Sequence, residues 1–231
     1  MPVARIALVG CLMLVGAASV PSRAQSVPEL TIARAQEQLR AMPDLPVPPD
    51  LLRVTDLIEF EGDQAATVDF AGREVHVRFR KTGAAWAPSQ IPSRSGGWVP
   101  IAAGFAQMTE MDQSGAISTL RGLVSGQATY AAVCGQGFYA PTLTALAAPE
   151  PGQRQGFILE SDVPARGTTV LEKYRYRIEM TAPPSPKSPR SCNGVPAGGS
   201  AQTWSATARR TRGFAGKSYR INVEGELSEI K

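Results

Sequence analysis

The stretch that most limits the possible folds runs from Met108 to Ala140, because its apolar residues recur at helical spacing ahead of a turn that carries Cys134. Intervals of three and four residues predict one apolar stripe on a helix, made of Met108, Met111, Ile117, Leu120, Leu123, Val124, Ala128 and Ala131. The opposite face is expected to meet solvent, with Glu110, Asp112, Gln113, Ser118, Arg121 and Gln127. We expect this helix to begin between Val99 and Met108, and its apolar side needs a sheet to cover it.

Alternating apolar and polar residues downstream predict the strands of such a sheet. One long strand is expected over Thr169 to Thr181, the next from Trp204 to Ala208 and the last from Tyr219 to Val223. A short helical turn is expected over Pro141 to Leu146. The segment 182–200 is rich in proline, serine and glycine, so it is expected to be a loop.

A second pattern of one helix and several strands precedes the long helix. A short amphipathic helix is expected after Thr31 as N-cap, and four strands that alternate apolar and polar residues follow from Leu52 to about Trp86. The segment 87–100 is expected to be a connector or long loop. The predicted class is α+β: a short helix plus an antiparallel meander in residues 25–92, then a helix packed on an antiparallel sheet in residues 93–231.

Residues 1–24 have the three-part layout of a secretory signal peptide: Arg5, an apolar run and a small-residue cleavage pattern that ends at Ala24. The apolar run is too short for a comfortable transmembrane helix, so the mature chain is expected to have no transmembrane segment. An alternative is a lipoprotein with Cys11 acylated. We expect an exported protein, periplasmic or extracellular.

Removal of this leader leaves Cys134 and Cys192, and an even number of cysteines in an exported chain predicts a disulfide. The alternative is two separate buried thiols. His76 is the sole histidine and no carboxylate cluster lies beside either cysteine, so neither a metal site nor a cofactor is expected.

The order of helix, cysteine turn, helical turn and strands over residues 108–231 resembles the soluble part of type IV pilins and type II secretion pseudopilins. The resemblance is carried by GAISTLRGLVSGQATYAAVCGQGFYAPTLTAL, KYRYRIEMTAP, WSATARR and SYRINVEGELSEI, with Val223 to Leu227 at the family's glycine-containing tail. It implies a helix on an antiparallel meander, and partners among envelope secretion or pilus proteins. The family's N-terminal assembly helix is missing. Some pseudopilins bind calcium through acidic loops near the C-terminus, but this chain has no Asp or Glu between Trp204 and Val223, so that site is not expected.

The sequence favours a non-catalytic exported protein that binds other proteins and does not polymerise as a pilin does. It contains no G-x-S-x-G, H-E-x-x-H or P-loop motif. One alternative is a periplasmic small-molecule binder with its pocket between the short helix and its strands. The other is a hydrolase that uses Asp56 with Glu59, or Asp69 with Glu74.

Charge gives no reason to expect nucleic acid as a partner. The formal net charge of +4 falls to +2 once Arg5 and Arg23 of the leader are removed. A basic patch is expected where the downstream strands gather Lys173, Arg175, Arg177, Arg209, Arg210, Arg212 and Arg220. The alternative is an ordinary solvated sheet face, balanced by Glu172, Glu179, Glu224 and Glu226.

Overall fold

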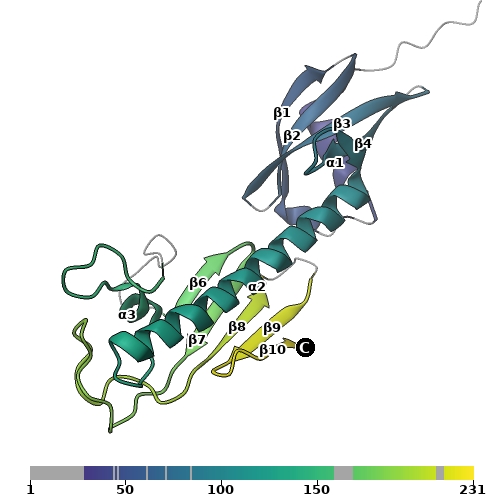
Figure 1. The fold of residues 1–231 in the computed structure, drawn as a ribbon. Coiled ribbons are helices and arrows are strands. Elements are labelled where there is room, and N and C mark those ends of the chain that lie inside the picture. The colour runs from purple at the N-terminus through teal and green to yellow at the C-terminus, as the bar shows by residue number, and fades with distance from the viewer. Residues whose placement is uncertain are drawn as a thin grey trace, which may run out of the picture.

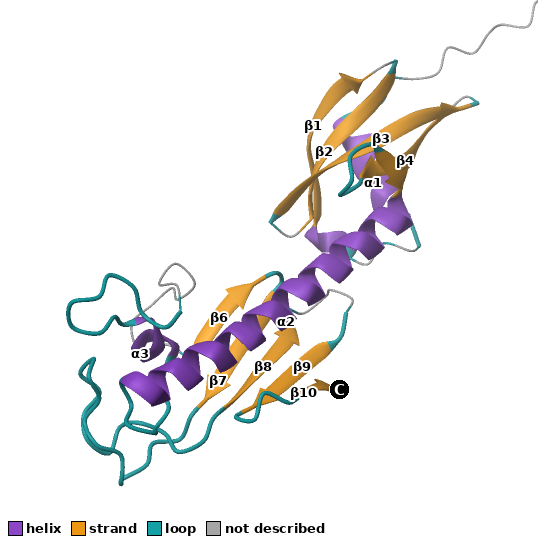
Figure 2. Ribbon diagram, in the orientation of Figure 1, coloured by secondary structure: helices purple, strands orange, loops and turns teal. Residues whose placement is uncertain are grey.

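Two antiparallel five-stranded sheets pack along one long helix (Figure 1). The computed structural model describes residues 29–43, 45, 47–60, 62–70, 72–83, 85–158, 169–211 and 216–231. The predicted leader therefore lies outside the described residues. The α+β class is confirmed, and Figure 2 shows the long helix running from one sheet to the other. None of the helices in the described part of the chain is long and apolar enough to cross a membrane.

The first sheet is a meander whose strands follow chain order: β1 (Leu52–Phe60), β2 (Asp63–Phe70), β3 (Arg73–Thr82), β4 (Ala85–Pro92) and β5 (Trp98–Pro100). Helix α1 (Ile32–Arg40) begins after Thr31, whose side chain caps it as predicted, and a short 3₁₀ helix (Pro49–Leu51) leads into β1. Gln36 fastens α1 to β1, because its amide donates to the carbonyl of Leu52 and accepts from the N–H of Val54, both at 2.6 Å. Ala35 and Leu39 are fully buried, so the interface between α1 and the sheet is a packed core.

The segment 87–100 was expected to be a connector, but it is mostly strand. β4 extends to Pro92, and β5 folds back so that Val99 pairs with Ile91. The turn between them contains Gly96 and Gly97 with φ of 87° and 79°, a left-handed conformation that glycine adopts without strain. The proline, serine and glycine residues therefore mark a hairpin turn and a short edge strand.

Helix α2 (Ile101–Val133) contributes to the cores of both sheets. Ile101 and Phe105 are buried in the core of the first sheet, whereas Leu120 and Tyr130 are buried in the core of the second. The helix thus changes its packing partner about halfway along its length. Most of its stability must come from this burial, because isolated helices with several glycines form poorly.

This change of partner overturns the predicted polar face at two positions. Asp112 is only 5% exposed and Gln127 is fully buried. Gln127 is tolerated there because its amide donates to the carbonyl of Ala140 at 3.0 Å and accepts from the N–H of Ala140 at 2.8 Å. Conversely, Met111 and Ala128 of the predicted apolar stripe are exposed. A single stripe cannot describe a helix that faces two differently placed sheets.

The second sheet has the order β10-β9-β8-β7-β6 and covers the C-terminal half of α2, as predicted. Its strands are β6 (Val170–Lys173), β7 (Tyr176–Thr181), β8 (Ser205–Arg210), β9 (Ser218–Asn222) and β10 (Leu227–Ile230). The predicted helical turn is α3 (Leu143–Ala147), whose first turn is capped by the Thr142 side chain.

Two strand predictions in this sheet were wrong. The single strand expected over 169–181 is a hairpin, in which Leu171 pairs with Ile178 across a turn at Tyr174 and Arg175. The last strand also does not end the sheet, because a turn with Gly225 at φ 79° leads into a fifth strand, β10. The first turn contains no glycine or proline, and the second contains a single glycine, so neither gave a strong signal that the chain reverses.

Three glycines of α2 let other segments approach the helix closely. A Cβ atom at Gly104 would overlap the side chain of Ile91, and one at Gly115 would lie 2.8 Å from the ring of Tyr174. At Gly126 a Cβ atom would lie 2.9 Å from the carbonyl oxygen of Phe157. These glycines weaken the helix by propensity but allow β4, the β6–β7 turn and the segment after α3 to pack on it.

We expect Gly104→Ala to lower the free energy of unfolding by about 1–3 kcal/mol, because the added Cβ atom would overlap the side chain of the fully buried Ile91. Gly122→Ala is the matched control: nothing lies within 4 Å of its added Cβ atom, so it should raise stability by about 0.5–1 kcal/mol. Urea unfolding followed by circular dichroism measures both changes. A shift of the same sign in the two variants would contradict the packing described at Gly104.

Candidate functional site

Asp112, in the middle of α2, is surrounded by three arginines. Its Oδ2 atom accepts hydrogen bonds from Nε of Arg175 at 2.9 Å and from both terminal nitrogens of Arg210 at 3.2 Å. Its Oδ1 atom lies 3.7 Å from a terminal nitrogen of Arg73. Arg73 begins β3, Arg175 lies in the β6–β7 turn and Arg210 ends β8. These four residues, the Asp112 cluster, therefore join the first sheet, the helix and the second sheet.

The Asp112 cluster is largely shielded from water. The side chains of Asp112 and Arg210 are each 7% exposed and that of Arg175 is 16% exposed, whereas that of Arg73 is 36% exposed. Burial lowers the pKa of Arg73, repulsion by Arg175 lowers it further, and attraction by Asp112 opposes both. One carboxylate thus faces three guanidinium groups.

The backbone of the β6–β7 turn positions one of these arginines. Tyr174 and Arg175 have φ of 55° and 57°, a left-handed conformation that side chains other than glycine adopt at a cost. The same two residues contact α2: the Tyr174 ring packs on Gly115, and the Arg175 side chain donates a hydrogen bond to Asp112. The helix contacts therefore hold the turn in its strained conformation.

A pocket of about 240 Å³ lies beside the Asp112 cluster, between the first sheet and α2. We call it the junction pocket. Its lining combines three segments and consists of Arg73, Glu74, Val75, His76, Pro92, Ser93, Arg94, Gly104, Gln107, Met108 and Met111. Arg73 belongs to both the pocket and the cluster, so the two features share one cationic side chain.

No protein-family model matches the chain, and no match is found among curated proteins or solved structures. The likeness to pilins therefore remains one of residue order and of a helix packed on an antiparallel sheet.

The structure divides the predicted basic patch between two faces of the second sheet. Arg175 and Arg210 point to the helix side and bind Asp112. The exposed Arg177, Arg209 and Arg220 lie on the outer side, where Arg177 is 3.8 Å from the carboxylate of Glu172. The Lys173 ammonium group lies 5.3 Å from the ring centroid of Tyr174. Arg212 lies outside the described residues.

Two of the four carboxylates considered for hydrolysis accept hydrogen bonds from nearby backbone N–H groups. Asp56 accepts from the N–H of Leu57 at 2.8 Å, and Asp69 accepts from the N–H of Gly72 at 2.6 Å in the β2–β3 turn. Asp69 and Glu74 are register partners on adjacent strands. His76 is exposed, and its Nδ1 lies 3.3 Å from the hydroxyl of Thr67. Within the described residues, no group of three His, Cys, Asp or Glu side chains is placed to hold a metal ion.

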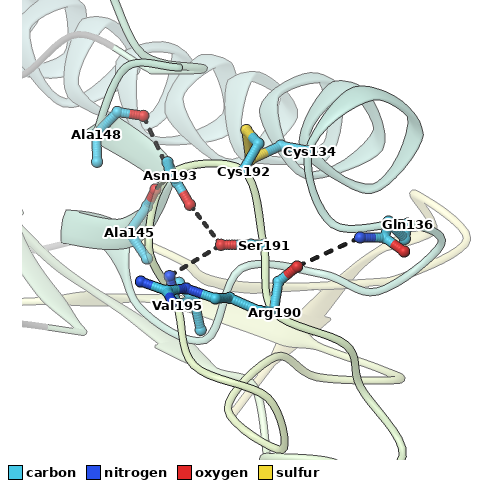
Figure 3. Close-up of a disulfide and its surroundings, with 9 residues drawn as sticks. All are labelled: Cys134, Gln136, Ala145, Ala148, Arg190, Ser191, Cys192, Asn193 and Val195. Atoms are coloured by element: carbon cyan, nitrogen blue, oxygen red, sulfur yellow. Dashed lines mark hydrogen bonds between the residues drawn. A yellow bond between two sulfur atoms is a disulfide. The ribbon is translucent and has the colours of Figure 1, made fainter. Parts of the chain in front are cut away.

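The predicted disulfide between Cys134 and Cys192 is confirmed, with an S–S distance of 2.05 Å (Figure 3). It joins the end of α2 to the proline-rich loop 182–200. The amide of Asn193, next to it, donates to the carbonyls of Ala145 and Ala148 at 2.8 and 3.2 Å. The loop is therefore fastened both to the helix end and to α3.

Proposed function

We propose that this protein is an exported, non-catalytic interaction protein with a pilin-like C-terminal half, and that its partners belong to an envelope secretion or pilus apparatus. The proposal is supported by the second half of α2, which packs on the antiparallel sheet β6–β10 and ends in the Cys134 turn. The disulfide fits an oxidising compartment outside the cytoplasm.

The observation that carries the proposal is the burial of the first turns of α2. In pilins, the helix that precedes the soluble domain is an exposed apolar segment, held in the membrane and then bundled in the filament. Here Ile101 and Phe105, at the start of α2, are 4% and 5% exposed because they pack in the core of the first sheet. The part of the helix that corresponds to a pilin's assembly segment is therefore already covered by the first sheet. We infer an accessory that binds the apparatus and does not become a filament subunit.

Capture from the organism's own cell envelope tests the partner. The tagged mature protein is crosslinked in isolated envelopes and recovered, with an unrelated exported protein carrying the same tag as background control. Enrichment of secretion or pilus components over that background is expected. Repeated recovery without any such component would refute the assignment to this apparatus.

We also expect the purified mature chain to remain unassembled, because the apolar residues at the start of α2 are covered by the first sheet. Analytical ultracentrifugation and negative-stain electron microscopy at increasing concentration measure this. Filaments, or a chain retained in the inner membrane with residues 1–24 intact, would instead indicate a pseudopilin subunit.

A further inference from the structure

The junction pocket offers cationic and apolar groups to the same small volume. Its cationic groups are Arg73 from β3 and Arg94 from the β4–β5 turn. Its apolar groups include Val75 on the sheet and Met108 and Met111 on the helix. Methionine side chains adapt their shape to a bound apolar group more readily than branched ones.

The two arginines of the pocket are not neutralised by carboxylates of their own. Asp112 is 3.7 Å from Arg73 but binds Arg175 and Arg210 more closely, at 2.9 and 3.2 Å. Arg94 is exposed, and no carboxylate of the described residues pairs with it. Glu74 is the one acidic residue in the pocket lining. An anion that entered the pocket would therefore meet an excess of positive charge.

The size of the pocket limits the ligand. Its volume of about 240 Å³ lies below the roughly 300–1,000 Å³ typical of pockets that hold drug-sized molecules. Guanidinium groups bind carboxylates through paired hydrogen bonds, which gives such a small site both affinity and orientation.

We propose that the junction pocket binds a carboxylate that carries a short apolar body. The carboxylate meets Arg73 and Arg94, and the apolar body lies against Met108 and Met111. The same chemistry is offered by a free short-chain acid and by the C-terminal residue of a polypeptide. Ligand binding at this site can be measured on the purified protein without any secretion partner. A negative result here therefore leaves the proposed function untouched, and the reverse also holds.

Isothermal titration of the mature protein with two matched ligand pairs tests the site. Hexanoate is compared with hexan-1-ol, and N-acetyl-leucine, which imitates a polypeptide C-terminus, with N-acetyl-leucinamide. Each acid is expected to bind at least ten-fold more tightly than its neutral partner, and binding should weaken as salt increases. Tighter binding of N-acetyl-leucine than of hexanoate would identify a polypeptide terminus as the source, and the reverse order a free acid.

Arg94→Gln is the decisive variant, because the exposed side chain has no ion pair within the described residues whose loss would unfold the protein. It should weaken binding of the acid at least ten-fold and leave the melting temperature unchanged. Arg121→Gln removes the same charge from an exposed position of α2 outside the pocket lining and should leave binding unchanged. Equal binding of acid and neutral ligand, no binding of either acid at millimolar concentration, or equal affinity in Arg94→Gln would each overturn the assignment.

Discussion

Replacement of Asp112 by alanine is expected to lower the free energy of unfolding by about 3–5 kcal/mol, because it removes a largely buried carboxylate that three arginines contact. The partial exposure of Arg73 places the expected value toward the lower end of that range. Because the cluster joins both sheets to α2, the two halves of the protein should lose stability together. Urea denaturation measured by tryptophan fluorescence and circular dichroism reports the loss.

Glu110→Ala is the matched control for this variant. Glu110 lies on the same helix, carries the same charge and is exposed, so its removal should change stability by less than about 0.5 kcal/mol. A loss in Asp112→Ala no greater than that in Glu110→Ala would show that the Asp112 cluster contributes nothing beyond surface charge.

Loss of the disulfide is expected to have an effect of similar size. Replacing both Cys134 and Cys192 by serine removes a crosslink between residues 58 positions apart. The loss of this constraint on the unfolded chain is expected to lower the free energy of unfolding by about 4 kcal/mol. The effect should concentrate in the loop 182–200, whose buried Ser185, Ser188 and Ser191 depend on the loop staying folded. Thermal unfolding with proteolysis mapping measures both the size and the place of the change.

Reduction provides the internal control for the disulfide. Dithiothreitol should destabilise the natural chain to the level of the double serine variant and leave that variant unchanged. Mass spectrometry that found both thiols free in protein isolated from the cell envelope would remove the basis for this expectation.

The sequence predicted those features that depend on local patterns. Periodicity placed α2 and most of the first meander, Thr31 marked the start of α1, and the count of cysteines predicted the disulfide. The sequence contains one indication of the hairpin over 169–181: Leu171 does not fit the alternation of apolar and polar residues in the rest of the segment. A break in alternation near a tyrosine and an arginine was too weak to indicate a turn that requires two left-handed residues.

The candidate site was not predictable from the sequence. Asp112 looked like an exposed helix residue, since its three arginines are 39 or more positions away in the chain and only the fold brings them together. Arg73 and Arg94 likewise carried no signal, because the pocket they line forms only where the first sheet meets α2. Burial of charge by tertiary contacts overrides the helical pattern at such positions.

Amide hydrogen exchange along α2, followed by mass spectrometry of the mature protein, most directly tests the claim that the start of the helix is covered and unavailable for assembly. Phe105 and Met108 pack in the first core and residues 116–130 in the second, so the amides of 105–111 and of 116–130 should both exchange slowly. The first four amides of the helix are left out of the comparison because they have no intrahelical acceptor. Fast exchange of 105–111 beside slow exchange of 116–130 would contradict the claim, because it would leave the first half of the helix as exposed as it is in a pilin.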